Sequence, residues 1–212
     1  MNASPWTTIV NRVVLLNTKW AYWNQMFGTK ATVDLLNGTA PSCFALLQES
    51  LLGDIITSIT RLLDPKISSG QKNVVVESLL DEPMAAQDRV ALTGALDGSK
   101  RNSGVFRAIR NKILSHEDQG VATGGVAVAL ADTVMITGAI TDINQLMTQL
   151  ASALSQLPVR FGPADLHGSG DTVCWVLEEG RKAMVIARSS SAGFSSVPDT
   201  SQVNVVYVRY PA

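Results

Sequence analysis

One segment of the sequence combines the residue types that can cleave a phosphodiester bond without a metal ion. Arg110 is followed six positions later by His116, which is one of two histidines in the chain. Histidine titrates near neutral pH and can transfer protons, and the planar guanidinium of arginine can hold two phosphate oxygens at once. RNA supplies its own nucleophile, the 2′-hydroxyl group. The pair therefore indicates ribonuclease chemistry as one hypothesis for this segment.

The spacing of this pair limits how a single copy of the chain could use it. Six residues at about 100° each leave Arg110 and His116 roughly 120° apart around an ideal helix. The reach of the arginine, or a local distortion near the helix end, could close that gap. A symmetric dimer is the other solution, because two copies bring four such side chains to one cleft. The spacing favours a composite site of this kind.

A purely structural role for the same residues is the competing interpretation. His116 follows apolar residues at helical intervals, which is also typical of a hydrogen-bonded histidine at the edge of a core. Arg110 could pair with Glu117, Asp118 or an acid on another helix, with little stabilisation if the pair is exposed. The residues alone leave both interpretations open.

The remaining candidate motifs indicate no second chemistry. His167 lies in a glycine-rich turn without a second ligand nearby, and Cys43 and Cys174 match no metal-ligand spacing. We therefore predict no metal and no cofactor, and we interpret both cysteines as small buried thiols. The stretch 168–170 (Gly-Ser-Gly) lacks the further glycine and lysine of a phosphate-binding loop, so helix capping is the preferred interpretation.

Composition excludes a protein that is basic over its whole surface. The 212 residues carry a formal net charge of -1, and 17% of them are charged. The net charge gives no positive electrostatic potential over the whole surface that would indicate a nucleic-acid partner. A local basic patch would not be visible in this average. The N-terminal residues lack the pattern of a secretory signal, and three glycines and Asp132 interrupt the most apolar window, 121–138. We predict a soluble, cytoplasmic chain without a membrane-spanning segment.

Hydrophobic spacing predicts the elements that must position the segment around Arg110. Apolar residues recur in steps of four and three along several stretches, which is typical of helices that pack one face on a partner. Asp64-Pro65 should stop one of them, because a residue before proline is pushed out of helical geometry. We expect a break at 97–99 and loops at 66–73 and 119–125. The predicted helices span about 5–27, 41–63, 74–80, 85–96, 101–117, 131–155 and 172–182.

These helices predict a mainly α protein with an up-and-down helical bundle. We assign residues 1–157 to the bundle and 158–212 to a C-terminal appendage packed on the same domain. The appendage contains the short helix 172–182. Alternating residues at 203–208 predict a strand, and pairing of this strand with 184–188 would give a small β-ribbon.

The motif and its surroundings resemble a known family. Arg110-Asn111 followed by His116, with five residues between arginine and histidine, resembles the motif of the HEPN superfamily. The wider pattern is similar to the abortive-infection AbiU-type branch of that superfamily, over roughly residues 5 to 155. The stretches that carry it are Asp34-Leu35-Leu36-Asn37 with Ala40-Pro41, Ile59 to Pro65, Gly70 to Asn73 leading into Glu77 to Leu80, and Arg110-Asn111-Lys112 through His116-Glu117-Asp118.

The resemblance implies a HEPN-like bundle that forms a homodimer across the motif helix. For active members it implies metal-independent RNA cleavage in phage defence or in toxin–antitoxin systems, with an antitoxin protein as a possible partner. Arg110 would then hold the scissile phosphate, and His116 would transfer protons or stabilise charge. Asn111 would orient one of these groups, and Asp118 would anchor the histidine or its loop.

Four further residues belong to this hypothesis. Arg107 and Lys112 lie in the same predicted helix and are candidates for substrate binding or orientation. Arg61 and Asp64 match the AbiU-type pattern as well, and for them a role in ending the preceding helix remains open.

Two other functions compete with the endoribonuclease hypothesis. A HEPN dimer without catalytic activity could use the same cleft to bind RNA, a nucleotide or a partner protein. Alternatively, the chain is a structural helical protein in which the arginine and histidine only contribute to packing.

Overall fold

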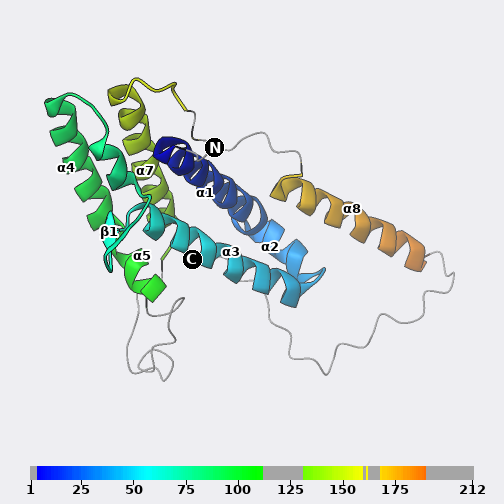
Figure 1. The fold of residues 1–212 in the computed structure, drawn as a ribbon. Helices are drawn as coiled ribbons and strands as arrows, with labels where there is room; N and C mark the ends of the chain where they lie inside the picture. Colours follow the sequence, from blue (N-terminus) through cyan, green and yellow to red (C-terminus); the bar gives the residue numbers. More distant parts are fainter. Residues whose placement is uncertain (1–3, 112–130, 160, 162–167, 190–212) are drawn as a thin grey trace, which may run out of the picture. The chain divides into compact units, whose positions relative to one another are not determined.

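The computed structural model describes residues 4–111, 131–159, 161 and 168–189 (Figure 1). This part of the chain is helical apart from one short β-ribbon, which confirms the predicted mainly α fold. Its contacts divide the chain into two compact units, one formed by Met1–Lys19 with Gly53–Pro163 and the other by Trp20–Leu52 with Ala164–Ala212. The boundary that we placed between residues 157 and 158 stays a prediction.

Two long helices begin and end where the sequence indicates. Helix α1 spans Pro5–Phe27, and its first turn is capped by Ser4, whose Oγ accepts from the backbone N of Thr7 at 3.2 Å. Helix α3 spans Pro41–Leu62 and stops just before Asp64-Pro65. Each of these helices contributes one part to each unit.

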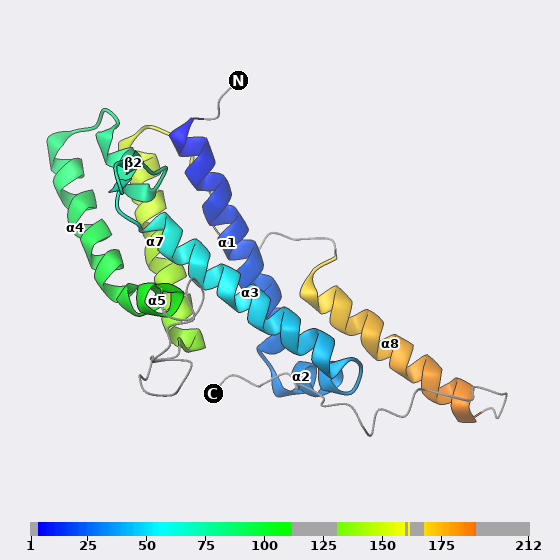
Figure 2. The ribbon, with the colours of Figure 1, turned by 60° about the horizontal axis from the view of Figure 1, so that its bottom comes forward.

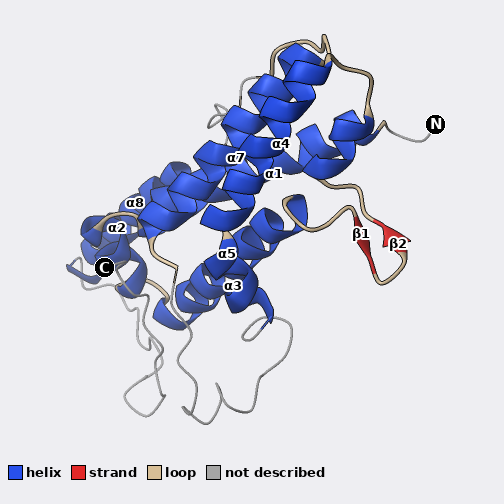
Figure 3. Cartoon of the chain, turned by 90° about the vertical axis from the view of Figure 1, so that its left-hand side faces the viewer, coloured by secondary structure: helices blue, strands red, loops and turns tan. Residues whose placement is uncertain are grey.

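The first unit also contains the elements between α3 and the end of the predicted bundle. A ribbon of β1 (Ile67–Ser68) and β2 (Gln71–Lys72) follows α3 (Figure 3). The 3-10 helix η1 (Val76–Asp81), α4 (Ala86–Asn102), α5 (Gly104–Ile109) and α7 (Thr133–Ala153) come next. Helices α4 and α7 pack side by side and run in opposite directions, as Figures 1 and 2 both show.

The core of the first unit consists of the apolar stripes that the four-three spacing predicts. Burying one such side chain completely contributes about 1.5–3 kcal/mol relative to leaving it in water. The largest fully buried members of this core are Ile9, Leu16, Ile55, Ile59, Leu62, Leu63, Leu79, Phe106, Ile136 and Ile143.

The predicted break at 97–99 is wrong. Helix α4 runs through these residues to Asn102, and the chain changes direction at Ser103 instead. A glycine inside a helix costs only about 1 kcal/mol relative to alanine. The burial of Leu96 and Ser99 on the packed face of α4 outweighs that cost at Gly98. The loop predicted at 66–73 is likewise more ordered than expected, because it contains the β-ribbon.

A reciprocal amide pair lies between α1 and α7 in the first unit. Asn17 Nδ2 donates to Asn144 Oδ1 at 2.9 Å, and Asn144 Nδ2 donates to Asn17 Oδ1 at the same distance. Asn17 is buried and uses its second amide hydrogen on the carbonyl of Val13. Because both amides are satisfied only in this register, the pair fixes how α1 and α7 align.

We predict that Asn144→Ala lowers the free energy of unfolding by about 1–3 kcal/mol, because it leaves the Oδ1 atom and one amide hydrogen of the buried Asn17 without a partner. The double variant Asn17→Leu/Asn144→Leu should recover most of this loss, since no buried polar group then lacks a partner. Urea denaturation followed by circular dichroism measures both effects. A loss below the error of the measurement for Asn144→Ala would show that the pair is not formed in solution.

The second unit contains a helix that we did not predict. Helix α2 (Lys30–Asn37) is capped by Thr29, whose side chain accepts from the backbone N of Thr32 at 3.2 Å. It packs on α8 (Gly170–Ser189), and Gln25 of α1 accepts from the backbone N of Gly170 at 2.9 Å. A Cβ atom at Gly170 would lie 3.0 Å from the carbonyl oxygen of Tyr22, so a larger residue here would force the neighbouring backbone to shift by a few tenths of an ångström. Trp20 and Trp23 stack nearby in α1, with ring centroids 5.2 Å apart.

The C-terminal helix is longer than predicted, and one predicted strand is wrong. Residues 184–188 belong to α8, so they cannot form the β-ribbon that we proposed. The other strand of that ribbon, 203–208, lies outside the described residues. The short helix expected at 172–182 is confirmed within α8.

The two cysteines differ from each other in exposure. Cys174 is buried, as predicted. The pKa of its thiol is raised, mainly by burial and also by the nearby negative charge of Asp171. Cys43 is exposed, which corrects our interpretation of it as a buried thiol. Its position in the first turn of α3 lies on the outer side of the apolar stripe.

We predict that a thiol-specific reagent such as DTNB modifies the exposed Cys43 rapidly at pH 8 and Cys174 slowly, because Cys174 is buried and the pKa of its thiol is raised. Cys43→Ser should remove the rapid phase, and Cys174→Ser should leave it unchanged. In denaturant both thiols should react at one rate. Equal rates in the folded wild-type protein would contradict the burial of Cys174.

Helix α3 has a composition that suits more than one environment. Among the described helices it alone is long and apolar enough to cross a membrane, with a mean hydropathy of 1.2 over the window and 22% of that window buried. The core helix of a soluble protein passes the same test. The absence of a membrane segment therefore stays a prediction.

Candidate functional site

Arg107 and Arg110 lie on one face at the end of α5. Phe106 and Ile109 of this helix are buried and anchor it in the core of the first unit. Arg110 continues the helical backbone with φ -55° and ψ -49°, and residues 110–111 are π-helical. Side chains three positions apart on a helix are neighbours, so the two guanidinium groups reach the same partner.

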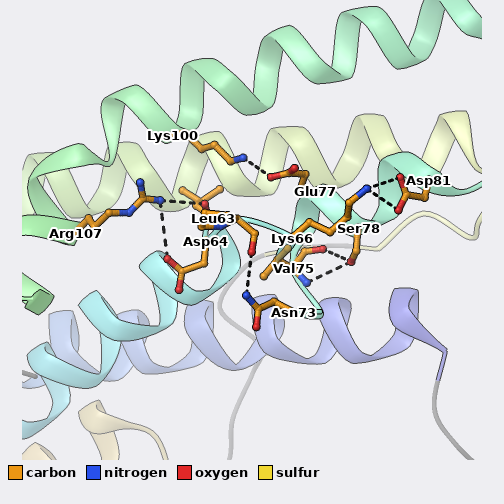
Figure 4. Close-up of polar contacts among 11 residues, drawn as sticks. Leu63, Asp64, Lys66, Asn73, Val75, Glu77, Ser78, Asp81, Lys100 and Arg107 are labelled. Carbon is orange, nitrogen blue, oxygen red and sulfur yellow. Dashed lines mark hydrogen bonds and ion pairs between the residues drawn. The ribbon is translucent and has the colours of Figure 1, made fainter. Parts of the chain in front are cut away.

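That partner is Asp64, the residue that follows the end of α3. Arg110 Nη1 contacts Asp64 Oδ2 at 2.7 Å, and the two side chains are 20% and 23% exposed. Arg107 Nη2 lies 3.9 Å from the other carboxylate oxygen (Figure 4). One carboxylate thus faces two guanidinium groups, and partial burial reduces the screening of its attraction by solvent.

Arg107 has a second function at the end of α3. Its Nη2 donates to the carbonyl oxygen of Leu63 at 3.3 Å (Figure 4). The last carbonyl groups of a helix have no intrahelical donor and carry partial negative charge, which a cation at this position stabilises. Arg107 therefore fixes the backbone from which Asp64 projects.

Hydrogen bonds hold the segment after Asp64 in place (Figure 4). Asn73 Nδ2 donates to the carbonyl of Pro65 at 3.0 Å, and Lys66 pairs with Asp81 at 2.9 Å. These contacts connect the exit of α3 to the β-ribbon and to η1. As a result, the position of Asp64 is determined from both sides along the chain.

The guanidinium of Arg110 keeps donors for a ligand. Arginine carries five N–H donors in a planar fork. Nη1 binds Asp64, and Nε donates to Asn111 Oδ1 at 3.2 Å. Among the described residues, nothing accepts from Nη2 of Arg110. The two contacts orient the plane of the guanidinium while its outer edge can still bind an oxyanion such as phosphate.

The structure brings together three of the six residues to which the sequence analysis gives a catalytic, substrate-binding or orienting role. Arg107, Arg110 and Asn111 lie at the end of α5 as described above. The other three, Lys112, His116 and Asp118, lie outside the described residues. The roles assigned to all six stay predictions.

Sequence reasoning missed Asp64 as the partner of Arg110. We considered an acid on another helix as a structural partner, and Asp64, just after α3, is an acid of that kind. Asp64 precedes Pro65, and this dipeptide predicted the end of a helix. It gave no indication that Asp64 pairs with Arg110. The two residues are 46 positions apart in the sequence, so no local sequence pattern reveals their contact.

The described residues contain no group of three or more histidine, cysteine, aspartate or glutamate side chains that could hold a metal ion. Both histidines of the chain lie outside those residues. The expectation that the site works without a metal or a cofactor therefore stays a prediction.

Comparison with known proteins gives one match. A family model described as AbiU2, of the HEPN type, matches residues 9–165 of the chain. This range includes Asp64, Arg107, Arg110 and His116. No significant match was found among curated proteins or among solved structures.

We predict a coupling energy of about 1–2 kcal/mol between Asp64 and Arg110 in a double-mutant cycle with Asp64→Ala, Arg110→Ala and the double variant. Their partial burial should make this coupling stronger than that of an exposed pair. Chemical denaturation of the four proteins measures it. The Lys30–Asp34 pair of α2, which is 76% and 60% exposed, is the matched control, with an expected coupling of about 0.3–0.5 kcal/mol. Equal coupling in the two cycles would mean that the Asp64–Arg110 contact is not maintained in solution.

Proposed function

The chain belongs to the AbiU2 family of HEPN domains, and we propose from this premise that it is a metal-independent endoribonuclease. In this proposal Arg110 holds the scissile phosphate and His116 transfers protons. The observation that carries the proposal is the orientation of Arg110, whose Nη1 and Nε are bound to Asp64 and Asn111 while Nη2 has no acceptor among the described residues. A guanidinium fixed in this way needs little further ordering to bind a phosphate.

The proposed reaction uses the nucleophile of the RNA itself. The 2′-oxygen attacks the adjacent phosphorus as its proton passes to a base, and the bond from phosphorus to the 5′-oxygen breaks as that oxygen receives a proton. The products are a 2′,3′-cyclic phosphate and a 5′-hydroxyl end. His116 is suited to move these protons because its pKa in water is close to neutral. Arg110 stabilises the extra negative charge on the phosphate oxygens in the transition state.

Asp64 is a positioning residue in this scheme. It accepts from Arg110, so it fixes the direction of the guanidinium without taking part in proton transfer. Its negative charge also weakens the field of Arg110 at the phosphate. The balance favours catalysis, since a cation without an anchor has to lose side-chain entropy when substrate binds.

The proposed homodimer and the proposed biological role follow from membership of the family. A homodimer would bring two copies of the motif helix to one cleft, which solves the angular separation of Arg110 and His116 along a helix. A role in abortive infection, or as a toxin controlled by an antitoxin protein, agrees with the AbiU2 assignment. Such an enzyme would act in the cytoplasm, where its RNA substrates are.

We predict that Arg110→Ala and His116→Ala each lower the cleavage of total RNA and tRNA by at least about 100-fold. EDTA should leave cleavage by the wild-type protein unchanged, and the new ends should be cyclic phosphates and 5′-hydroxyls. Arg101→Ala is the matched control, because Arg101 is an exposed arginine of α4 with no contact to this site. Circular dichroism and light scattering should show that all variants keep the fold and the dimer.

Three results would contradict parts of this proposal. A requirement for magnesium, or cleavage that survives both substitutions, would remove the mechanism. RNA binding without any cut product would favour the non-catalytic HEPN dimer. A strict monomer in light scattering would remove the composite cleft.

A further inference from the structure

A groove with a volume of about 570 Å³ lies in the first unit between α1, α3 and the segment after the β-ribbon. Four cationic side chains line it: Arg12 and Lys19 of α1, Arg61 of α3, and Lys72 of β2. Two carboxylates, Asp54 and Asp64, line it as well. The groove is therefore locally basic in a chain with a formal net charge of -1.

Both carboxylates are already neutralised by a cation. Lys19 Nζ pairs with Asp54 at 2.6 Å, and Arg110 pairs with Asp64 at 2.7 Å from outside the groove lining. The other three cations of the groove have no carboxylate partner among the described residues, so no neighbouring negative charge offsets theirs. These cations are Arg12, Arg61 and Lys72. An anion entering the groove meets a positive potential that the two acids barely reduce.

The fold holds these cations in defined places. Arg12 Nη1 donates to the carbonyl of Val74 at 2.5 Å, which ties α1 to the exit of the β-ribbon. The turn of the ribbon uses Ser69 and Gly70 with φ of 48° and 75°, a conformation that glycine adopts without strain. The ribbon then pairs Lys72 with Ile67, and Asn73 N donates to the carbonyl of Lys66 at 2.8 Å. Lys72 thus projects from a short, hydrogen-bonded element.

The lining indicates which kind of anion fits. Among its described lining residues there is no aromatic side chain on which a base could stack. Nor do these residues include a glycine-rich loop of the kind that surrounds the phosphates of a bound nucleotide. Cations that come from three separate elements suit several phosphates in a row better than one. These features favour the backbone of a nucleic-acid strand over a mononucleotide.

The groove is directly connected to the candidate site. Asp64 lines the groove and also binds Arg110, so one residue belongs both to the groove and to the contact that orients the motif arginine. We propose that the groove binds the phosphate backbone of a single RNA strand, with Arg61 and Lys72 as its main contacts, and leads that strand to Arg110. This inference rests on the proposed function for the choice of RNA as ligand. The contacts are to phosphates and are therefore independent of base sequence.

Binding to an RNA that cannot be cut tests the groove independently of catalysis. The probe is a fluorescent 2′-O-methyl oligouridylate of about 20 nucleotides, which is long enough to cover one binding groove and its approach. The double variant Arg61→Gln/Lys72→Gln keeps the aliphatic parts of both side chains and removes two charges. It should raise the Kd about tenfold at low salt and lower the slope of log K against log salt by about 1.4, because each phosphate contact on a single strand contributes about 0.7.

The matched control is Arg101→Gln/Arg181→Gln, which removes two charges from exposed arginines of α4 and α8 that do not line the groove. It should bind the probe as the wild-type protein does. Equal effects of both double variants would overturn the proposal, since binding would then follow total charge. An unchanged Kd for Arg61→Gln/Lys72→Gln would overturn it as well. If ATP or inorganic phosphate binds through these residues while the oligonucleotide does not, a small phosphate ligand replaces the strand and the proposal is wrong.

Cleavage assays separate this inference from the proposed function. If the protein cuts RNA, Arg61→Gln/Lys72→Gln should raise KM for long RNA and change kcat little, because the groove binds substrate and transition state alike. If the protein cuts nothing but binds the probe through Arg61 and Lys72, the ribonuclease proposal fails and the groove stands. If it cuts RNA with an unchanged KM in this variant, the groove proposal fails and the ribonuclease stands.

Discussion

The candidate site depends on a single carboxylate that faces two guanidinium groups. Asp64 is fixed by the proline that follows it and by Arg107, which donates to the carbonyl of Leu63 just after the end of α3. A carboxylate has no proton to donate at neutral pH, so it can only accept, and it fills this role for Arg110 at 2.7 Å. Because the pair is only partly exposed, the contact is more than a solvated surface ion pair. It turns a long, flexible arginine into a group with a defined direction.

The same carboxylate explains how a chain of nearly neutral charge can present a basic surface. The two acids of the groove form ion pairs with Lys19 and Arg110. The local electrostatic potential is therefore determined by the remaining cations, Arg12, Arg61 and Lys72. Net charge averages over the whole molecule and therefore misses such an arrangement. In the proposed account the groove and the motif form one path for RNA, with phosphate contacts along α1, α3 and β2 and chemistry at the end of α5.

Much of the fold, and less of the site, could be predicted from the sequence. The four-three spacing of apolar residues is a local property, and it located α1, α3 and α7 to within two residues of their ends. The local signals failed at Gly98, which α4 tolerates because its neighbours are buried. They also failed at 184–188, which belong to α8 although Met184 and Val185 are exposed. The motif pattern led to Arg110. Its partner Asp64 and the cations of the groove come from separate elements, and only the packed structure brings them together.

The central claim is that Arg110, held by Asp64, contacts an RNA phosphate. The most direct measurement is the NMR signal of the arginine Nε–H groups in ¹⁵N-labelled protein, with Arg110 assigned by Arg110→Lys, during titration with RNA whose 2′-oxygens are methylated so that cleavage is blocked. The account predicts that the Arg110 signal shifts and saturates together with binding, and that the shift is lost or broadened in Asp64→Ala. An Arg110 signal that stays unchanged at full saturation with RNA would contradict it.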